Sequence, residues 1–316
     1  MLKVSRSLPD IAVLRGGKKY FKESLIDGGE VLSSLSKIGY QPLDVLIGKD
    51  GEWTAHGKST DAHNIFSRAH TVIDTTHTHG EGFHALAKKM GIPLLFSRGN
   101  EIIMDREDMY RILRQQGIRT PDTVVIRAKQ PLKDDLVRNI WSKLHIPLIV
   151  RPLVRHDEVP SKLIKNFSDL EETIRDYHSR GVDTHTFTYR KVPTSSVAIL
   201  PNFRGEQLYM PVWIETFSSI NDIPGPDSTI HAHMNAPDFR KEQVREFATK
   251  VYNALPVSGP VCIDIIPYNN EYVVVNVDTS PSLRKDGRFM KSLATTGVDV
   301  GQYIHSCVQT DMGTKD

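Results

Sequence analysis

The strongest chemical signal in this 316-residue sequence is a group of oxygen-bearing side chains near its C-terminus. Residues 261–267 and 272–278 alternate apolar and polar side chains with the period of two that is typical of β-strands. The polar positions include Asp264 in the first stretch, and Asn276 and Asp278 in the second. Carboxylate and amide oxygens suit a hard cation such as Mg²⁺. The hairpin is therefore a candidate metal site, although Asp and Asn are also ordinary at the solvent-facing end of a sheet.

The turn between these two strands decides whether the three side chains share a face. A three-residue loop, Asn269-Asn270-Glu271, places Asp264 directly opposite Asn276, with Asp278 next along. A two-residue Asn-Asn turn would move Asp264 to the other face, because a shift of one residue inverts every side chain. A shared metal site therefore requires the longer loop.

The composition excludes several classes of protein. The sequence has 40 Lys and Arg against 38 Asp and Glu, so its formal charge of +2 gives no general attraction to nucleic acid or acidic membranes. Hydrophobic residues make up 39% and charged residues 25%, as in soluble globular proteins. The two cysteines cannot form a disulfide framework, and neither a membrane span nor a signal peptide is recognisable. We expect a cytoplasmic protein that binds neither nucleic acid nor membranes.

The candidate metal ligands must be positioned by the predicted strands and helices of the chain. In the first hundred residues these strands and helices alternate. Apolar runs predict strands at 11–14, 43–47, 71–74 and 92–96, and helical spacing predicts helices near 31–38 and 83–90. Such alternation over about a hundred residues predicts a parallel sheet covered by helices.

The rest of the chain predicts two further units. A capping box at Asp105 opens a helix to Gly117, and a second box, Ser168 with Glu171, opens the helix 170–178. With strands at 123–126 and 148–150 these form a small α+β unit. The last third has strands at 196–200 and 208–214, a helix through 244–255, the hairpin, and a helix near Tyr303. We place the domains at 1–103, 104–193 and 194–316.

A series of short motifs, taken in order, resembles the ATP-grasp ligases and most closely the D-alanine–D-alanine ligase family. The resemblance covers nearly the whole chain, and its pieces are Ile11–Gly17, Met104-Asp105-Arg106, Ile146–Pro152, Val197–Leu200, Asn235-Ala236-Pro237 and the run from Cys262 to Pro281. It implies an α/β, partly α+β, fold of three ATP-grasp domains, the first with a Rossmann-like parallel sheet.

The activity that the resemblance implies is an ATP-dependent ligation of two amino acids. ATP phosphorylates one carboxylate, a second amino acid's amine attacks the acyl phosphate, and the dipeptide serves peptidoglycan synthesis. The family assigns Mg²⁺, with Mn²⁺ as a substitute, to Asp264, Asn276 and Asp278, and the ATP phosphates to Arg106 and Arg151. It also implies a homodimer. A different amino-acid substrate, or a binding protein without catalysis, remains the alternative.

Several positions depart from the family pattern. At the metal site the family's Glu is Asn276 and its Asn is Asp278, while Arg106 and Arg151 replace lysines. Arginine binds phosphate well but does not copy the point charge of lysine. The Gly-Ser-rich phosphate loop is replaced by residues 155–160, which contain two acids and a proline but no glycine. Thr194 stands near the place of the acid that holds the ribose.

The family's arginine two residues before the metal aspartate is replaced by Cys262. Because that arginine would stabilise the tetrahedral intermediate, Arg284, Lys285 and Arg288 are candidates to replace it. Glu23, which precedes Ser24-Leu25, either holds a substrate ammonium or caps the following helix.

Two weaker patterns have ordinary explanations. Gly80 and Gly82, followed by Ala85, mimic a dinucleotide fingerprint but are better explained as a strand–helix turn. A group of five histidines could ligate a transition metal. The sequence has no matching cysteines and no paired HxxxH, so we expect these histidines to lie on the surface. This group consists of His77, His79, His84, His231 and His233.

Overall fold

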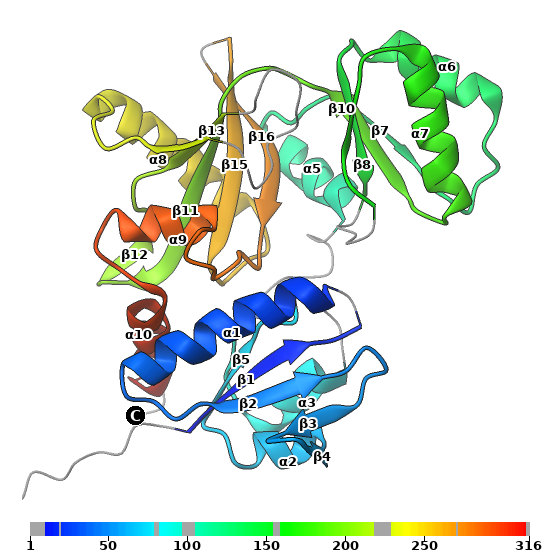
Figure 1. The fold of residues 1–316 in the computed structure, drawn as a ribbon. Helices are drawn as coiled ribbons and strands as arrows, with labels where there is room; N and C mark the ends of the chain where they lie inside the picture. Colours follow the sequence, from blue (N-terminus) through cyan, green and yellow to red (C-terminus); the bar gives the residue numbers. More distant parts are fainter. Residues whose placement is uncertain are drawn as a thin grey trace, which may run out of the picture.

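The computed structural model describes residues 10–18, 20–78, 82–96, 105–153, 159–217, 229–269 and 271–313. Their strands form three sheets, which follow one another along the chain (Figure 1). Two sequence-based predictions lie outside these residues: the glycine pattern at Gly80, with His79 beside it, and the phosphate loop as far as residue 158.

The first sheet is the predicted parallel one. Its order is β4-β3-β2-β1-β5-β6, and β1 runs parallel to both β2 and β5. The strands are β1 (Ile11–Gly16), β2 (Leu43–Ile47), β3 (Trp53–Ala55), β4 (Lys58–Thr60), β5 (Thr71–Asp74) and β6 (Leu94–Leu95). The antiparallel strands β3 and β4 were not predicted. The chain leaves β1 for β2 on one side and returns as β5 on the other, so the carboxyl ends of β1 and β5 form a topological switch point. Open α/β sheets bind ligands at such points.

Helix α1 (Phe21–Lys37) covers this sheet, with α2 (Ala62–Phe66) and α3 (Gly82–Met90) further along the chain. The apolar side chains of α1 at Val31 and Leu35 recur at helical spacing and are fully buried. Gly28 allows the helix to lie close to the sheet. A side chain at this position would not fit, because its Cβ would lie 2.6 Å from Cβ of Arg15 and 2.9 Å from Oγ1 of Thr75.

The second sheet is larger than the predicted α+β unit. Its order is β7 (Thr123–Ile126), β10 (Thr184–Thr188), β8 (Leu148–Pro152) and β9 (Lys162–Ile164), with helices α6 (Asp134–Lys143) and α7 (Phe167–Ser179). The predicted cap at Ser168 is wrong. Asn166 caps α7 instead, because its extended backbone lets its side chain accept a hydrogen bond from the amide of Asp169 at 2.9 Å.

The third sheet carries the hairpin. Its order is β14 (Thr229–Ala232), β13 (Ile214–Phe217), β11 (Thr194–Phe203), β15 (Val261–Tyr268) and β16 (Glu271–Asp278), and β12 (Glu206–Tyr209) pairs with β11. The single strand predicted at 208–214 is thus two. The helices of this part are α8 (Asp238–Ala254), α9 (Arg288–Ala294) and α10 (Val300–Gly313).

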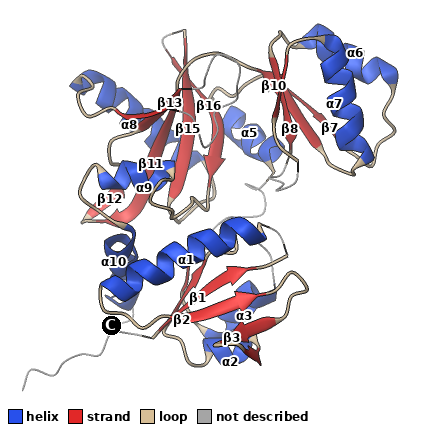
Figure 2. Cartoon of the chain, viewed as in Figure 1, coloured by secondary structure: helices blue, strands red, loops and turns tan. Residues whose placement is uncertain are grey.

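Two helices pack away from their neighbours in sequence (Figure 2). Helix α5 (Arg106–Gln115) places Met109 and Leu113 in the core of the third sheet, beside α8. Helix α10 packs on α1 and contributes Tyr303 to the core of the first sheet. The second sheet keeps a core formed only by residues between 124 and 182.

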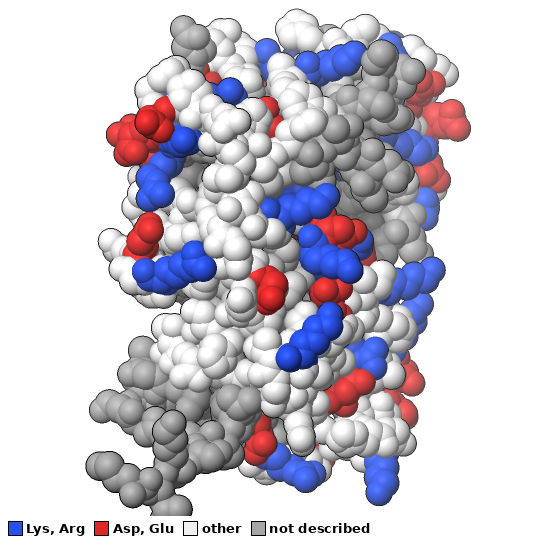
Figure 3. Space-filling view, turned by 60° about the vertical axis from the view of Figure 1, so that its left-hand side comes forward, with Lys and Arg blue, Asp and Glu red and all other residues white. Residues whose placement is uncertain are grey.

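Acidic and basic side chains are interspersed on the face shown in Figure 3, in keeping with the near-balanced charge. None of the helices in the described residues combines the length and the hydropathy needed to cross a bilayer.

Candidate active site

The β15–β16 hairpin brings Asp264 and Asn276 together by a route that the sequence did not predict. Tyr268 pairs with Glu271, so the connection is a two-residue turn and the predicted three-residue loop is wrong. The register then shifts between Asp264 and Ile265, because Val275 is an extra residue in β16. This β-bulge restores the predicted pairing of Asp264 with Asn276. Asp278 lies opposite Cys262, on the same face.

Asp264 is nearly buried and is held by three side chains. Its Oδ1 accepts hydrogen bonds from Oγ of Ser196 at 2.6 Å and from Nη1 of Arg288 at 2.9 Å. Its Oδ2 lies 3.4 Å from Nδ2 of Asn276. The negative charge of Asp264 raises the pKa of Arg288 above its ordinary value. Of the three basic residues predicted to replace the family's arginine, Arg288, at the start of α9, is therefore the one that contacts Asp264.

The other basic candidate, Arg284, lies apart from Asp264. Its guanidinium binds the carboxylate of Asp286 through contacts of 2.9 and 2.5 Å. Glu23 and Asp27 act on it electrostatically from α1. Glu23 itself lies in the first turn of α1, whose N-cap position is occupied by Tyr20. Both interpretations of Glu23, as the partner of a substrate ammonium and as a helix cap, stay predictions.

Arg106 and Arg151 converge from α5 and β8. Nη1 of Arg106 donates to the carbonyl oxygen of Leu153 at 2.8 Å, whereas its Nε is buried without a hydrogen-bond partner among the described residues. Nη2 of Arg151 donates to the hydroxyl of Tyr110 at 3.3 Å and to the carbonyl oxygen of Val275 at 3.2 Å. Burial and the charge of Arg151 lower the pKa of Arg106 to about 9. Two partly buried cations near one another favour a polyanion between them.

His185 fixes the orientation of Arg151. Its Nδ1 accepts a hydrogen bond from Nε of Arg151 at 3.3 Å. Burial and the charge of Arg151 lower the pKa of His185 well below its ordinary value, so the imidazole is neutral and has a lone pair for this bond. The ring of Phe187 also lies 4.6 Å beneath the Arg151 guanidinium.

Six of the predicted site residues line a single cleft of about 540 Å³ between the second and third sheets, whereas Glu23, Asp278 and Arg284 are not among its lining residues. Arg106, Arg151 and Thr194 line it together with Asp264, Asn276 and Arg288. Arginines outnumber acids along its walls, and Phe187, Tyr189 and Tyr268 add aromatic surface. The cleft can hold a phosphorylated ligand with an aromatic ring.

A hard divalent cation fits the acidic end of this cleft by the chemistry of its donors. Asp264 and Asn276 offer oxygens there, and Asp278 keeps one carboxylate oxygen beside the one that accepts from the amide of Ser280 at 3.1 Å. Two carboxylates and an amide suit one such cation, with phosphate oxygens completing its coordination. No group of three or more His, Cys, Asp or Glu side chains that could hold a metal ion occurs anywhere in the described residues, so a cation here would depend on the two carboxylates, the amide and the phosphate oxygens.

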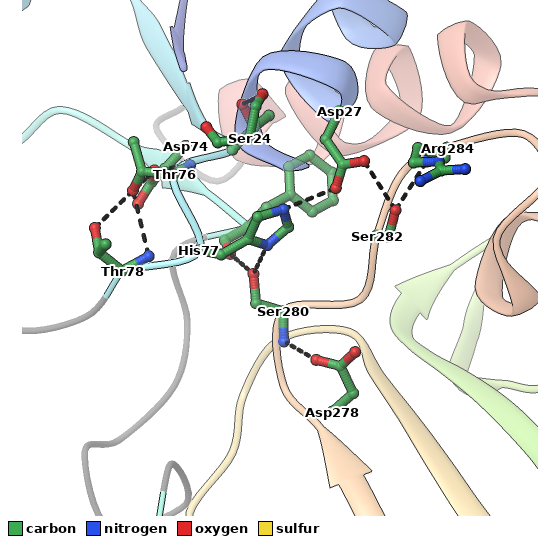
Figure 4. Close-up of polar contacts among 12 residues, drawn as sticks. Ser24, Asp27, Asp74, Thr76, His77, Thr78, Asp278, Ser280, Ser282 and Arg284 are labelled. Atoms are coloured by element: carbon green, nitrogen blue, oxygen red, sulfur yellow. Dashed lines mark hydrogen bonds and ion pairs between the residues drawn. The ribbon is translucent and has the colours of Figure 1, made fainter. Parts of the chain in front are cut away.

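A second polar cluster lies at the switch point of the first sheet, next to the end of β16 (Figure 4). Nε2 of His77 lies 2.8 Å from Oδ2 of Asp27, and its Nδ1 lies 3.5 Å from Oγ of Ser280. Oγ of Ser282 donates to Oδ1 of Asp27 at 2.9 Å. His77 and His84 are therefore not the predicted surface histidines. Each is held against a buried carboxylate, that of Asp27 and of Asp74 respectively.

Asp27, Ser280 and Ser282 were not among the site residues predicted from the sequence. They lie 50 residues and more than 200 residues from His77, so no local spacing connects them. The one available signal was the apolar strand 71–74 ending in Asp74 and Thr75, at the edge where parallel sheets bind ligands.

Comparison with known proteins yields one family. The model of the family described as "D-ala D-ala ligase C-terminus" matches residues 112–309. A D-alanine–D-alanine ligase of Bacillus anthracis is 24% identical over 317 residues, covering 96% of this chain and 97% of that protein. The same enzyme from Francisella tularensis is 24% identical over 311 residues, covering 95% and 97%.

Solved structures show the same fold. The Bacillus anthracis D-alanine–D-alanine ligase complexed with ATP superposes with a TM-score of 0.74 at 18% identity, covering 97% of this chain and 98% of that one. The VanG D-Ala:D-Ser ligase of Enterococcus faecalis has a TM-score of 0.75 at 16% identity, covering 96% and 99%. The expected ATP-grasp fold is confirmed.

Proposed function

The chain belongs to the D-alanine–D-alanine ligase family, and from this we propose that it is an ATP-dependent ligase that joins two amino acids. One amino acid is activated as an acyl phosphate, and the amine of the second attacks it to form a dipeptide for peptidoglycan synthesis. D-Alanine is the proposed substrate on both sides, as the names of the relatives suggest.

The observation that carries this proposal is the convergence of Arg106 and Arg151 on the cleft that also contains Asp264. Two partly buried guanidiniums, one with a buried Nε lacking a hydrogen-bond partner among the described residues, form a place for phosphate oxygens. Asp264 of β15 lies at the acidic end of the same cleft, and this end is suited to a cation. Polyphosphate and a hard cation are the two components that phosphoryl transfer requires.

The roles that we infer follow from these positions. Arg106 and Arg151 bind the phosphates of ATP and offset the charge on the transferred group. Thr194, on the cleft wall, offers a hydroxyl to the ribose. Asp264, Asn276 and Asp278 hold Mg²⁺, for which Mn²⁺ can substitute, and the bound cation supplies charge neutralisation. Arg288 stabilises the oxyanion that forms when the amine attacks, in place of the arginine replaced by Cys262.

Glu23 and Arg284 lie outside the lining of the cleft, near the switch point of the first sheet. We assign them to the amino-acid substrates, Glu23 to an ammonium group and Arg284 to a carboxylate. The domain boundaries that we propose are 1–103, 104–193 and 194–316. A cytoplasmic homodimer is the proposed state.

The test is Mg²⁺-dependent release of phosphate from ATP, with and without D-alanine. Stimulation by D-alanine, with dipeptide detected as product, is the expected result. In the Arg151→Gln variant, we expect ATP to bind more weakly, so that its KM rises. No phosphate release with any amino acid, from protein shown to be folded, overturns the ligase proposal and leaves an ATP-binding protein.

A second candidate is the same chemistry with a different amino acid. It is favoured by the position of Arg288, because α9 follows the loop 279–287 whereas the family's arginine precedes the metal aspartate on β15. A guanidinium that approaches from a different element changes the shape available to the second substrate. Stimulation of phosphate release by an amino acid other than D-alanine would support this candidate.

A further inference from the structure

We propose that His77, oriented by Asp27, accepts the proton of the incoming amine in the ligation step. The inference rests on the proposed function, because it concerns the second half of that reaction. It is carried by the hydrogen-bonded chain from Asp27 through His77 to Ser280, which joins α1, the end of β5 and the end of β16 (Figure 4).

Asp27 fixes the tautomer of His77. A carboxylate only accepts hydrogen bonds, so the hydrogen of His77 lies on Nε2, 2.8 Å from Asp27, and the lone pair lies on Nδ1. Asp27 is only 2% exposed and is itself held by Ser282 at 2.9 Å. A buried, hydrogen-bonded carboxylate that orients an imidazole also stabilises the imidazolium formed when Nδ1 takes a proton.

The backbone of His77 has a conformation that the turn after β5 maintains and that six other non-glycine residues in the described part of the chain share. Its φ of 55° lies in the left-handed region, which residues other than glycine rarely adopt. The turn after β5 holds this conformation through Asp74, whose Oδ1 accepts hydrogen bonds from the amide and hydroxyl of Thr76. Such backbone conformations cluster at functional sites.

The position of His77 suits the reaction. Nδ1 faces Ser280, whose amide donates to Asp278 at 3.1 Å, so the imidazole lies next to the segment that follows the proposed cation site. It also lies at the switch point of the first sheet, where a small substrate is expected to bind. Asp27 of α1 contacts the imidazole directly, Ser280 connects it to Asp278, and Glu23 and Asp27 act electrostatically on the nearby Arg284.

The chemistry balances. An α-amino group carries a proton at neutral pH and is not a nucleophile in that form. Transfer of one proton to Nδ1 frees the nitrogen lone pair, which attacks the acyl carbon. The new C–N bond forms, the C–O bond to phosphate breaks with its electron pair, and a second proton leaves on the phosphate. The imidazolium then returns its proton to solvent.

Hydroxylamine separates this step from acyl-phosphate formation, because it is largely uncharged at neutral pH and needs no base. With the amino acid that stimulates the wild-type enzyme, the wild type should form both hydroxamate and dipeptide. His77→Gln should keep hydroxamate formation within about twofold and lose dipeptide formation by about 10²-fold or more, as for a removed general base. That loss should shrink as pH rises, because the uncharged amine increases about tenfold per pH unit below its pKa.

Two further variants control for structural damage. Asp27→Asn, which keeps the size of the side chain but reverses the tautomer, should behave like His77→Gln. His70→Gln, just before β5 and away from this turn, removes an exposed histidine that lies 4.0 Å from Asp10, and should keep both products.

The outcomes are distinguishable. A wild-type protein that forms neither product overturns the proposed function and this inference with it. If His77→Gln keeps both products, or loses both equally while remaining folded, only the role of His77 is overturned.

Discussion

At the scale of single residues, the arrangement around Asp264 combines an acid with a guanidinium from a distant part of the chain. Arg288 binds Asp264 and Ser196 at 2.9 and 3.0 Å, while Cys262, two residues before Asp264, is buried in apolar surroundings. Burial raises the pKa of the Cys262 thiol, so this residue stays neutral. The positive charge of the site is therefore supplied by α9 and not by β15.

Replacing Arg288 with Gln tests this arrangement. Gln can keep a hydrogen bond to Asp264 but lacks the charge, so we expect kcat to fall by about 10²-fold, as for the loss of one preorganised electrostatic donor. Steady-state kinetics of dipeptide formation measures the effect. Arg111→Gln is the control, since Arg111 pairs with Asp108 on the surface, where such pairs contribute about 0–1 kcal/mol. A large loss in Arg284→Gln together with none in Arg288→Gln would assign the charge to Arg284 instead.

The sequence could predict which residues belong to the cleft but not how they meet. Asp264 and Asn276 were identified from residue type and strand spacing, and Arg106 and Arg151 from the family resemblance; all four line the cleft, whereas the predicted Glu23, Asp278 and Arg284 do not. The choice of Arg288 over Arg284 depended on the path of residues 279–287, which no spacing rule describes. The Asp27–His77 pair was missed because it depends on how closely α1 packs on β5, a property of tertiary structure.

At the scale of elements, the hairpin shows why strand registers are hard to predict. The alternation of side chains fixed the pairing of Asp264 with Asn276, but a three-residue loop and a two-residue turn with a bulge produce the same pairing. The actual turn begins at Asn269, whose φ of 48° is tolerated by asparagine. Bulges leave no signature in a run of valines, so Val275 could not be recognised as the extra residue.

Because α1 packs closely on the sheet, alanine substitutions at two adjacent glycines should change the free energy of unfolding in opposite directions. A Cβ at Gly28 would overlap Arg15 and Thr75, whereas one at Gly29 would meet nothing within 4 Å. We expect Gly28→Ala to lower the free energy of unfolding by about 1–3 kcal/mol through overpacking. Gly29→Ala should raise it by up to about 1 kcal/mol through helix propensity. Urea unfolding of both variants measures the difference, and equal effects would contradict the packing at Gly28.

The turn after β5 should depend on pH through Asp74. Burial alone would raise the pKa of Asp74, but hydrogen bonds from His84 and Thr76 outweigh it and lower the pKa below the ordinary 3.8. A lowered carboxyl pKa contributes stability that is present above the unfolded-state pKa and is lost as pH falls through the folded-state value.

Asp74→Asn removes that contribution. At pH 7 the variant should be less stable than wild type by about 1–3 kcal/mol, the range for hydrogen bonds to a charged group. The difference should shrink below pH 3.8, where the wild-type carboxyl begins to be protonated in the unfolded chain. Thermal unfolding at several pH values measures it. A difference that is constant down to pH 2 would show that Asp74 contributes nothing through its charge.

At the scale of the whole molecule, the three sheets differ in how self-sufficient their cores are. The first sheet shares its core with Tyr303, Ile304 and Val308 of α10, so it depends on the end of the chain. The third shares its core with α5 from the start of the central unit. Among the described residues, the hydrophobic core of the second sheet is formed within one segment, between residues 124 and 182, although polar contacts such as Arg106 with Leu153 join this sheet to α5. The cleft thus lies between a unit with its own core and two units that share theirs, so we predict that the second sheet can move as a rigid body relative to the rest.

Excised fragments test this difference directly. A fragment of residues 118–193 contains the whole core of the second sheet, including the fully buried Leu148, Ile174 and Tyr177, and should fold alone. At this size a single core is marginal, so we expect a stability of about 3–5 kcal/mol or less. A fragment of residues 10–103 should not fold, because Val31 and Leu35 lose their contacts with α10 and become exposed. Circular dichroism and urea titration of both fragments distinguish the two, and adding an α10 peptide should order the second fragment alone. If the first fragment is unfolded while the second folds cooperatively without the peptide, the second sheet does not fold independently, and movement of that sheet as a rigid body loses its physical basis.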